Sequence, residues 1–451
     1  MSDPRTAGDL LPELARRAAA WPAVVLDDDP TGTQTLRDVH VLTAWDAVSI
    51  ERHLDDPVVF LSTNSRSLDE AAAIEVTRDA AAHARQAASI TWRSVSLISR
   101  SDSTLRGHFP AEVLAMANAA GMPEARILLT PYFGEGGRVT VDDVHLLEIG
   151  GVRTPVAETE FARDAAFGYR SSNLRDWVAE KYAAARIPPP EVISLSLELV
   201  RDAGPEAVAG ALRSLSPGGV AIGNAETDGD IEVLALGSML AEEHDLPLVA
   251  RTAASYVRAR AGRAPAPLLA PHELGVDGPG VVIVGSHVET TTRQLDGLRR
   301  SRPDVEIHEL AIDPLLDGGD AAATATADAA AVLDAALAAG RSAVVATERG
   351  RREVGLDGAR VISAALVAVV ERLATRPAWM VAKGGITSHD TAARGLAMRD
   401  ALVAGQLLPG VPVWIGAEES RWRGMPLVVF PGNVGADDAL TAIVAALMPT
   451  G

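Results

Sequence analysis

The chain contains no cysteine and only two lysines, Lys181 and Lys383. The lack of cysteine excludes disulfides, thiolate metal sites and thiol nucleophiles. Because Lys and Arg together number 41, the other 39 basic residues are arginines. This skew is typical of genome composition rather than of a local function, and it makes the position of each lysine informative.

Positive charge is also scarce overall. Asp and Glu number 60 against 41 basic residues, which gives a formal net charge of -19 and a pI near 5.0. A nucleic-acid partner is not expected, because phosphate backbones bind to broad basic surfaces. No run of eighteen apolar residues occurs, so we expect no transmembrane helix and no membrane partner. The first thirty residues have no uninterrupted apolar core of a secretory signal, and we expect a cytoplasmic location.

What the sequence does have is material for a large core. Its 451 residues are 47% hydrophobic and 22% charged, enough for two or three domains and against disorder as the main state. Short β-branched runs alternate with Ala-, Arg- and Glu-rich stretches, a pattern that predicts an α/β fold of mostly parallel sheets flanked by helices. Residues 258–280 are rich in Pro, Gly and Ala and form the predicted linker between domains 1–262 and 278–451.

The expected strands follow from the β-branched runs. They lie near residues 24–27, 58–61, 95–99, 127–130, 192–195 and 220–223 in the first domain, and near 281–284, 343–346, 379–382, 411–415 and 427–430 in the second. Ser67 and Glu70 stand three apart before an Ala-rich run, which is the pattern of a capping box at a helix start.

Polar residues gather where three strands of the first domain end. Asp27, Asp28 and Asp29 follow the first strand and lead into Thr31 and Gly32. The carboxyl ends of strands are where open α/β sheets hold ligands; an Asx turn alone would also explain this run. The other two strand ends carry Ser65 and Arg66, and Arg100, Asp102, Ser103 and Arg106. Arginine binds carboxylates bidentately, so the set suits a polyhydroxy acid, although a structural Arg–Asp pair is the alternative.

Three strand ends of the second domain carry small residues before a helix. The predicted nucleotide-binding set is Gly285, Ser286, Lys383, Gly384, Gly385, Ile386, Thr387, Ser388, Gly432 and Asn433. Backbone amides at helix starts receive phosphate, and we expect the Lys383 ammonium near the phosphates. Lys181 is predicted to be a solvated surface residue. Neither GxxxxGK[ST] nor GxGxxG occurs, so an ordinary P-loop or dinucleotide motif is not supported, and the histidines show no zinc spacing.

These motifs together resemble those of the four-carbon acid sugar kinase family, formerly a domain of unknown function. The resemblance covers nearly the whole chain. It rests on Asp28–Gly32 for Asp-Asp-x-Thr-Gly, residues 102–107 for Asp-Ser-Thr-Leu-Arg-Gly, and Glu135–Arg138 for Glu-Gly-Gly-Arg. In the second domain it rests on Gly285 and Ser286, on Gly384–Ser388, and on Pro431–Gly435 for Pro-Gly-Asn-x-Gly. The run from Phe161 to Tyr169 looks like one branch of the family.

The resemblance implies a sugar-acid-binding N-terminal domain, an ATP-binding C-terminal domain and an active-site cleft between them. The implied reaction is phosphorylation of a terminal hydroxyl of a four-carbon acid sugar of the threonate, erythronate or 3-oxo-tetronate type, with Mg²⁺ accompanying ATP. Asp28, Asp102 and Arg106 are the catalytic candidates, with either Asp28 or Asp102 as the base. Asp29, Thr31, Gly32, Ser65, Arg66, Arg100 and Ser103 are the substrate-binding candidates.

Two other functions stay open at this point. A catalytically silent sensor would bind the sugar acid or the nucleotide without transfer, and a dehydrogenase would use a nicotinamide dinucleotide instead. The sequence does not identify the metal ligands or the particular acid sugar. It is compatible with a homodimer, but no feature requires one.

Overall fold

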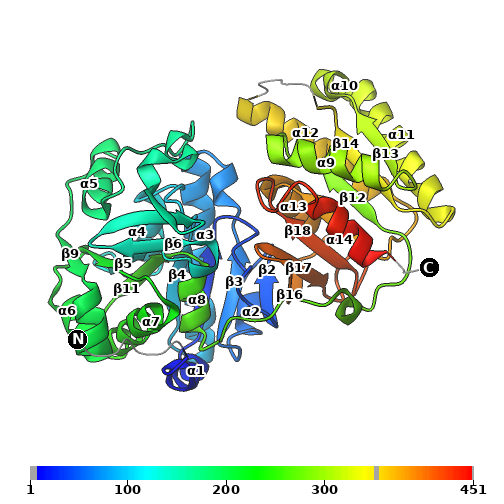
Figure 1. The fold of residues 1–451 in the computed structure, drawn as a ribbon. Helices are drawn as coiled ribbons and strands as arrows, with labels where there is room; N and C mark the ends of the chain where they lie inside the picture. The colour runs from blue at the N-terminus through cyan, green and yellow to red at the C-terminus, as the bar shows by residue number, and fades with distance from the viewer. Residues whose placement is uncertain (1–7, 350–354, 449–451) are drawn as a thin grey trace. The chain divides into compact units, whose positions relative to one another are not determined.

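The computed structural model describes residues 8–349 and 355–448, and it divides into two units. The first comprises the described residues up to Val39 together with residues 45–266. The second comprises His40–Ala44 and the described residues from Pro267 onward. Both are α/β units, which confirms the predicted fold class, and each is described by itself below (Figure 1).

The first unit is built on a parallel sheet. Across the sheet the strands are β3 (Val58–Ser62), β1 (Ala23–Asp27), β4 (Ser96–Arg100), β11 (Leu248–Thr252), β5 (Arg126–Thr130), β10 (Val220–Gly223) and β9 (Val192–Leu195). Strands β1, β3, β4 and β11 are buried at every position, and β1 and β3 accordingly appear in the sequence as nearly continuous apolar runs. The register aligns Asp27 with Ser62 on one side and with Arg100 on the other, so three polar loops leave the sheet side by side.

Helices cover both faces of this sheet. They are α1 (Leu11–Ala20), α2 (Ala47–Glu51), α3 (Glu70–Thr91), α4 (Ala111–Ala119), α5 (Leu174–Ala184), α6 (Gly204–Ser214), α7 (Asp228–Glu242) and α8 (Ala254–Arg260). Helix α3 packs against α4, whereas α1, α6, α7 and α8 form a second packed group. The connections through α3 and α4 run along the sheet toward β9, whereas those through α6 and α7 run back toward β11. Because crossovers between parallel strands are right-handed, the two groups of helices lie on opposite faces of the sheet.

A small antiparallel sheet is inserted after β5. It consists of β6 (Arg138–Val141), β7 (Val144–Ile149) and β8 (Val152–Pro155). The chain then makes two 3₁₀ turns, η3 (Val156–Glu158) and η4 (Glu160–Arg163), before it reaches α5.

The second unit has a mixed, mostly parallel sheet. Its strand order is β13 (Glu306–Leu310), β14 (Ala343–Thr347), β12 (Val281–Val284), β15 (Met380–Lys383), β18 (Pro426–Phe430), β17 (Val411–Gly416), β16 (Asp400–Leu408) and β2 (Val39–Leu42). Strand β17 is antiparallel to both of its neighbours, β16 and β18. The remaining pairs from β13 to β18 are parallel.

Helices also flank this second sheet. They are α9 (Glu289–Ser301), α10 (Ile312–Asp317), α11 (Gly319–Ala338), α12 (Gly355–Arg372), α13 (Gly385–Asp390) and α14 (Ala439–Leu447). Helices α9 and α14 pack together over a core that includes Leu295, Val344 and Leu440. Helix α11 is long and apolar enough to span a membrane, with a mean hydropathy of 1.3. It lies against β13, β14 and α12, and a helix covering a sheet passes the same test, so this is weak evidence for a membrane span.

Several details differ from the sequence-based expectations. Strands β2, β6, β7, β8, β11, β13 and β16 were not predicted, because they are short or carry polar and glycine residues. The predicted linker begins too early, since Arg258 and Arg260 form the end of α8 and are 1% exposed. The cap of α3 is Asp69, whose side chain accepts a hydrogen bond from the Ala72 amide, and not Ser67.

Candidate functional site

The polar residues at the ends of β1, β3 and β4 form one connected cluster of ion pairs. Arg66, from the loop after β3, pairs with Asp29 and lies 3.3 Å from a carboxylate oxygen of Asp102. Arg100, the last residue of β4, lies 3.2 Å from Asp27 and 3.6 Å from Asp28. The aligned strand ends bring these charges together, although 73 positions separate Asp27 from Arg100.

Arg106 and Asp102 form a two-point pair within the loop after β4. The guanidinium donates from Nε to Oδ2 at 2.9 Å and from Nη2 to Oδ1 at 3.1 Å. Thr104 also donates to Asp102 from both its amide and its hydroxyl. Arg66 contacts the same carboxylate, so Asp102 is held by two guanidiniums and a threonine. A carboxylate bound in this way is stabilised as the anion.

The four aspartates of the cluster differ in acidity. Burial raises the pKa of Asp27 to about 7 and that of Asp28 to about 6. Burial also opposes ionisation of Asp29, but Arg66, Arg100 and the Thr31 hydrogen bonds hold its pKa at about 2. The pKa of Asp102 lies well below its usual range despite burial, because Arg106 and Arg66 are close. The cluster therefore contains two strongly held anions and two carboxyl groups that exchange protons near neutrality.

Asp28 is the aspartate with uncommitted oxygens. Its side chain is 2% exposed, and neither carboxylate oxygen has a hydrogen-bond partner among the described residues. Buried polar atoms are normally hydrogen-bonded, so such an atom at a strand end indicates a place for a ligand group. Gly107 faces this carboxylate with φ +123°, and a Cβ there would lie 3.2 Å from Asp28 Oδ2 and 2.6 Å from Arg251 Nη2. The backbone approaches so closely that only glycine fits.

The remaining substrate-binding candidates lie in the same region with different surroundings. Thr31 donates from its amide and hydroxyl to Asp29, so the Asx-turn interpretation is correct for that pair. Gly32 packs against the Asp27 carboxylate, where a Cβ would collide. Ser65 donates to Glu112. The Ser103 carbonyl accepts a hydrogen bond from His145, whereas the partly buried side chain of Ser103 has no hydrogen-bond partner among the described residues.

Two buried residues of this region were missed from the sequence. Arg251 on β11 donates to Ser99 at 2.7 Å and to Glu112 on α4 at 2.8 Å, and both charged side chains are nearly inaccessible. Arg251 was missed because β11 itself was not predicted. The only signal for Glu112 was an acidic residue in the first turn of a helix, which the helix dipole explains equally well.

In the second unit, the three glycine-containing loops converge at the carboxyl ends of β12, β15 and β18. A Cβ on Gly432 would lie 2.4 Å from Ser286 Oγ, and one on Gly384 would lie 3.2 Å from Ser286 Cβ. Thr291 on α9 bridges two of the loops, because its hydroxyl contacts Ser286 Oγ at 3.1 Å and the Gly432 carbonyl at 2.8 Å. This arrangement suits phosphate or ribose, which bind to backbone amides and hydroxyls.

Other predicted nucleotide-binding residues occupy the start of α13. Gly384 caps this helix and Gly385 begins it, followed by Ile386, Thr387 and Ser388. Thr387 packs against Gly285, where a Cβ would lie 2.2 Å from the threonine hydroxyl. Ser388 donates to the Ala382 carbonyl at 2.7 Å and is fully buried, so its hydroxyl is already used. Asn433 is exposed.

Lys383 lies beneath these loops rather than among the groups that face outward. Its side chain is 0% exposed, and Nζ donates to the Pro431 carbonyl at 2.7 Å and lies 3.4 Å from that of Gly432. Its third contact is the ring of Phe430, at 3.5 Å from Nζ to the centroid. Burial lowers its pKa to about 7. The ammonium supports the Pro431–Gly432 backbone, and its position near the phosphates of a bound nucleotide stays a prediction.

Arg349 is a cation that the sequence did not single out in this unit. It follows β14, donates to the Ser286 carbonyl at 2.7 Å and to Thr292 Oγ1 at 2.8 Å, and is partly buried. The sequence did contain one signal for Arg349. It stands just after the carboxyl end of β14, next to Thr347 and Glu348, where polar residues of an α/β sheet often bind ligands.

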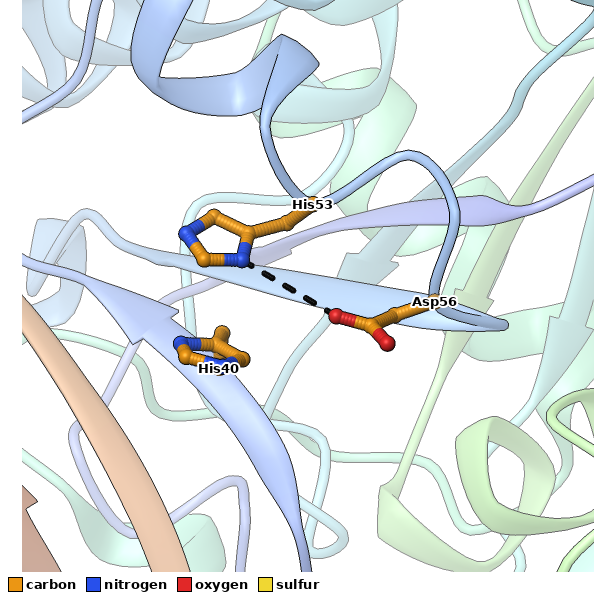
Figure 2. Close-up of side chains that lie close together, drawn as sticks. All are labelled: His40, His53 and Asp56. Atoms are coloured by element: carbon orange, nitrogen blue, oxygen red, sulfur yellow. Dashed lines mark ion pairs between the residues drawn. The ribbon is translucent and has the colours of Figure 1, made fainter.

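No metal site follows from the described residues. His53 and Asp56 form an ion pair at 3.9 Å in the first unit (Figure 2). His40, which Figure 2 also draws, belongs to the second unit, where its Nδ1 lies 2.8 Å from Asp400. The ligands of any Mg²⁺ stay unassigned.

Comparisons with known proteins also distinguish a sugar-binding part and a nucleotide-binding part of the chain. A model of a sugar-binding N-terminal domain matches residues 23–260, and a model of a nucleotide-binding C-terminal domain matches residues 281–440. No curated protein matches the chain.

Solved structures show the same fold. A "putative tRNA synthase" from Salmonella typhimurium LT2 is 16% identical, with a TM-score of 0.66 over 94% of this chain and 98% of the other. A Haemophilus influenzae protein of family DUF1537 is 17% identical, with a TM-score of 0.60 over 93% and 100%. At these identities the likeness concerns the fold alone. Because the sugar-binding model covers more than half of the chain, the chain belongs to the family of proteins with this sugar-binding N-terminal domain, here joined to a nucleotide-binding C-terminal domain.

Proposed function

We propose that this protein is an ATP-dependent kinase that phosphorylates a terminal hydroxyl of a four-carbon acid sugar. The observation that carries the proposal is Asp28. In a sugar-binding domain, its buried carboxylate lies close to Arg66 and Arg100, and neither of its oxygens has a hydrogen-bond partner in the part of the chain that the structure describes. Such a group is suited to accept the proton of a substrate hydroxyl as that hydroxyl attacks a phosphorus atom.

Asp28 is a better base than Asp102 on physical grounds. A general base needs a free oxygen and a pKa near the working pH. The pKa of Asp28 is raised to about 6 by burial, whereas that of Asp102 is lowered by its two arginines. Protonating Asp102 would also weaken its pairs with Arg106 and Arg66. We therefore assign Asp28 as the base, and Asp102 as the residue that orients Arg106 and Arg66.

The second unit supplies the nucleotide side of the proposal. Its loops around Ser286, Gly384 and Gly432 would hold ATP, and Mg²⁺ bound to the ATP phosphates would neutralise part of their charge. Direct transfer needs the phosphoryl donor and the acceptor hydroxyl in contact, so the proposal retains the interdomain active site predicted from the sequence. Catalysis would then depend on positioning and charge neutralisation rather than on a covalent intermediate.

The test is a coupled assay of ADP release over threonate, erythronate and 3-oxo-tetronate with Mg²⁺ and ATP. Asp28→Asn should lower kcat by about 10²- to 10⁴-fold, the usual contribution of a general base. The matched control is Asp38→Asn, because Asp38 is an exposed carboxylate 69% accessible to solvent. It should leave kcat unchanged.

Other outcomes would identify the alternatives. Binding of an acid sugar and of ATP without any ADP release would indicate a sensor. Stabilisation by a nicotinamide dinucleotide instead of ATP would indicate a dehydrogenase. Unchanged kcat in Asp28→Asn would refute the assignment of the base even if the protein proves to be a kinase.

A further inference from the structure

A pocket separate from the loops described above lies beside the small antiparallel sheet of the first unit. It has a volume of about 410 Å³. Its polar lining includes Arg138 at the start of β6 and Thr154 on β8, and its apolar lining includes Leu147 on β7 and Phe161 in η4. Glu160 lies at its exposed edge. Pockets of this size with few polar groups on an apolar wall are typical sites for small ligands.

Arg138 is the notable charge in this pocket. Its Nε is buried and has no hydrogen-bond partner among the residues that the structure describes, and Nη1 donates to the Gly136 carbonyl. Across residues 8–349 and 355–448, no carboxylate forms an ion pair with it. Burial lowers its pKa, which means that its surroundings do not compensate the charge fully. The guanidinium stays protonated all the same, because arginine does not lose its proton in proteins.

The pocket adjoins the aspartate–arginine cluster through a shared ring. The guanidinium carbon of Arg106 lies 5.0 Å from the centroid of Phe161, and that of Arg138 lies 6.0 Å from the same centroid. The charge of Arg106 is already matched by Asp102, and Asp164 lies 3.7 Å away. Arg66 and Arg100 are likewise paired with aspartates. An anion that approaches those three arginines therefore also meets carboxylates in direct contact with them. At Arg138 it meets a guanidinium without a direct ion pair among the described residues, with Asp102 acting on it only at longer range and Glu160 at the exposed edge of the pocket.

We infer that Arg138 binds the carboxylate of the substrate and that this pocket holds the acid end of the molecule, with its carbon chain against Phe161. The inference rests on the proposed function, because it takes the acid sugar as the ligand. It goes beyond the proposed function by assigning recognition of the acid group and reaction of the hydroxyl to different residues. Arg138 recognises the acid group, and the cluster around Asp28 acts on the hydroxyl. This also gives a role to the Glu-Gly-Gly-Arg segment, which has none in the proposal above.

The test compares acids with uncharged analogues of the same length. Dissociation constants of threonate and erythronate, and of threitol and erythritol, are measured by calorimetry with the unmodified protein, Arg138→Met and Arg138→Lys. Arg138→Met should weaken binding of the acids about 10- to 100-fold, the loss expected for a charge-assisted pair, and should leave the tetritols unchanged. The affinity of Arg138→Lys for the acids should lie between those of the unmodified protein and Arg138→Met, because lysine keeps the positive charge but cannot form the two parallel hydrogen bonds of a guanidinium.

Controls separate this effect from unfolding and from failure of the proposed function. Arg153→Met removes an arginine on the neighbouring strand β8 that is paired with Glu148 and Glu226; it should leave acid binding intact. The Tm of Arg138→Met should be equal or higher, since an unpaired buried charge is removed. Equal loss for acids and tetritols, or no loss, overturns the inference, as does an unmodified protein that binds none of the acids. Acids that bind through Arg138 without any ADP release would refute the kinase and leave the inference standing.

Discussion

At the scale of single residues, the candidate site shows how neighbouring carboxylates acquire different chemistry. Asp28 and Asp29 are adjacent in the sequence, yet the pKa of Asp28 is raised to about 6 and that of Asp29 is lowered to about 2. Asp29 has Arg66 and Thr31 as direct partners, whereas the oxygens of Asp28 have no hydrogen bond to any residue that the structure describes. At Asp28 burial outweighs the attraction of the nearby arginines, whereas at Asp29 the direct pair with Arg66 and the Thr31 hydrogen bonds outweigh burial.

The raised pKa of Asp28 predicts two pH effects with definite signs. If Asp28 is the base, kcat/KM should fall as the pH drops through about 6, because the protonated acid cannot accept a proton. For stability, the folded state keeps a proton between pH 4 and 6 that the unfolded state releases, so ionisation of Asp28 lowers the stability of the native protein as the pH rises. The Tm of Asp28→Asn should therefore equal that of the unmodified protein at pH 4 and exceed it by a few degrees at pH 8.

Thermal unfolding of both proteins from pH 4 to pH 8 measures this directly. A difference in Tm that shrinks as the pH rises would contradict the raised pKa. A rate profile without a break near pH 6 would contradict the role of Asp28 as base.

The two lysines have similar surroundings in the structure. Lys383 contacts two carbonyls and a phenylalanine ring, and Lys181 donates to the carbonyls of Phe167 and Gly168 with Tyr169 and Trp177 beside it. Lys181 is partly exposed, as expected of a surface residue, but its ammonium is also hydrogen-bonded to these two carbonyls. Both ammonium groups hold loop backbone in place, a task for which a compact group with three donors is suited.

Lys383→Met should separate positioning from stability. The substitution removes the cost of a buried charge but leaves the buried Pro431 carbonyl without its donor. These two effects oppose each other, so the Tm should change little. The Kd for ATP should nevertheless rise about tenfold, because the Pro431–Gly432 backbone loses its support. Calorimetric titration with ATP and Mg²⁺ gives this value. Lys181→Met is the matched control and should leave the Kd for ATP unchanged, and an unchanged Kd in Lys383→Met would remove the proposed role.

At the scale of elements, strand ends and tight turns position the candidate sites. Glycine is required at Gly384, which has φ +121° and lies close to Ser286 and Thr387. A side chain there would be strained by the backbone conformation and would also push against Ser286. The loops at β12 and β15 therefore approach each other more closely than a Cβ on Gly384 would allow without a shift of its neighbours.

A pair of glycine variants tests this close approach. Gly384→Ala and Gly424→Ala both place a side chain at positive φ, but only the first meets neighbouring atoms within 4 Å. Both should lower the Tm, since the backbone strain costs about 1–3 kcal/mol. Only Gly384→Ala should also weaken ATP binding, by about tenfold or more. Equal ATP affinity in the two variants would show that the contact with Ser286 is unimportant for the nucleotide.

The predictability of the elements follows their burial. Strands such as β1 and β12 are buried on both faces and appear in the sequence as unbroken apolar runs, and these were predicted within one or two residues. Strands β13 and β16 carry polar and glycine residues, since their positions are partly exposed. Strand β11 was missed because Arg251 interrupts its apolar pattern, although this arginine is buried through its pair with Glu112.

At the scale of the whole molecule, net charge and ligand chemistry are opposed. A chain of net charge -19 repels acid sugars and ATP at long range. Binding therefore depends on local groups. In our proposals Arg138 binds the acid sugar, and backbone amides of the second unit bind ATP. The absence of a nucleic-acid partner, the cytoplasmic location and a homodimer stay predictions.

The sequence by itself determined the α/β class, the two kinds of domain and the strand ends at which polar residues gather, because these depend on local patterns of a few residues. Only the tertiary structure decided which charges meet. Asp102 is held by Arg66 and Arg106, Lys383 is buried under its loops, and Asp28 and Arg138 are left with uncommitted groups. Desolvation and ion pairing depend on distances between segments remote in the chain, and no local pattern contains those distances.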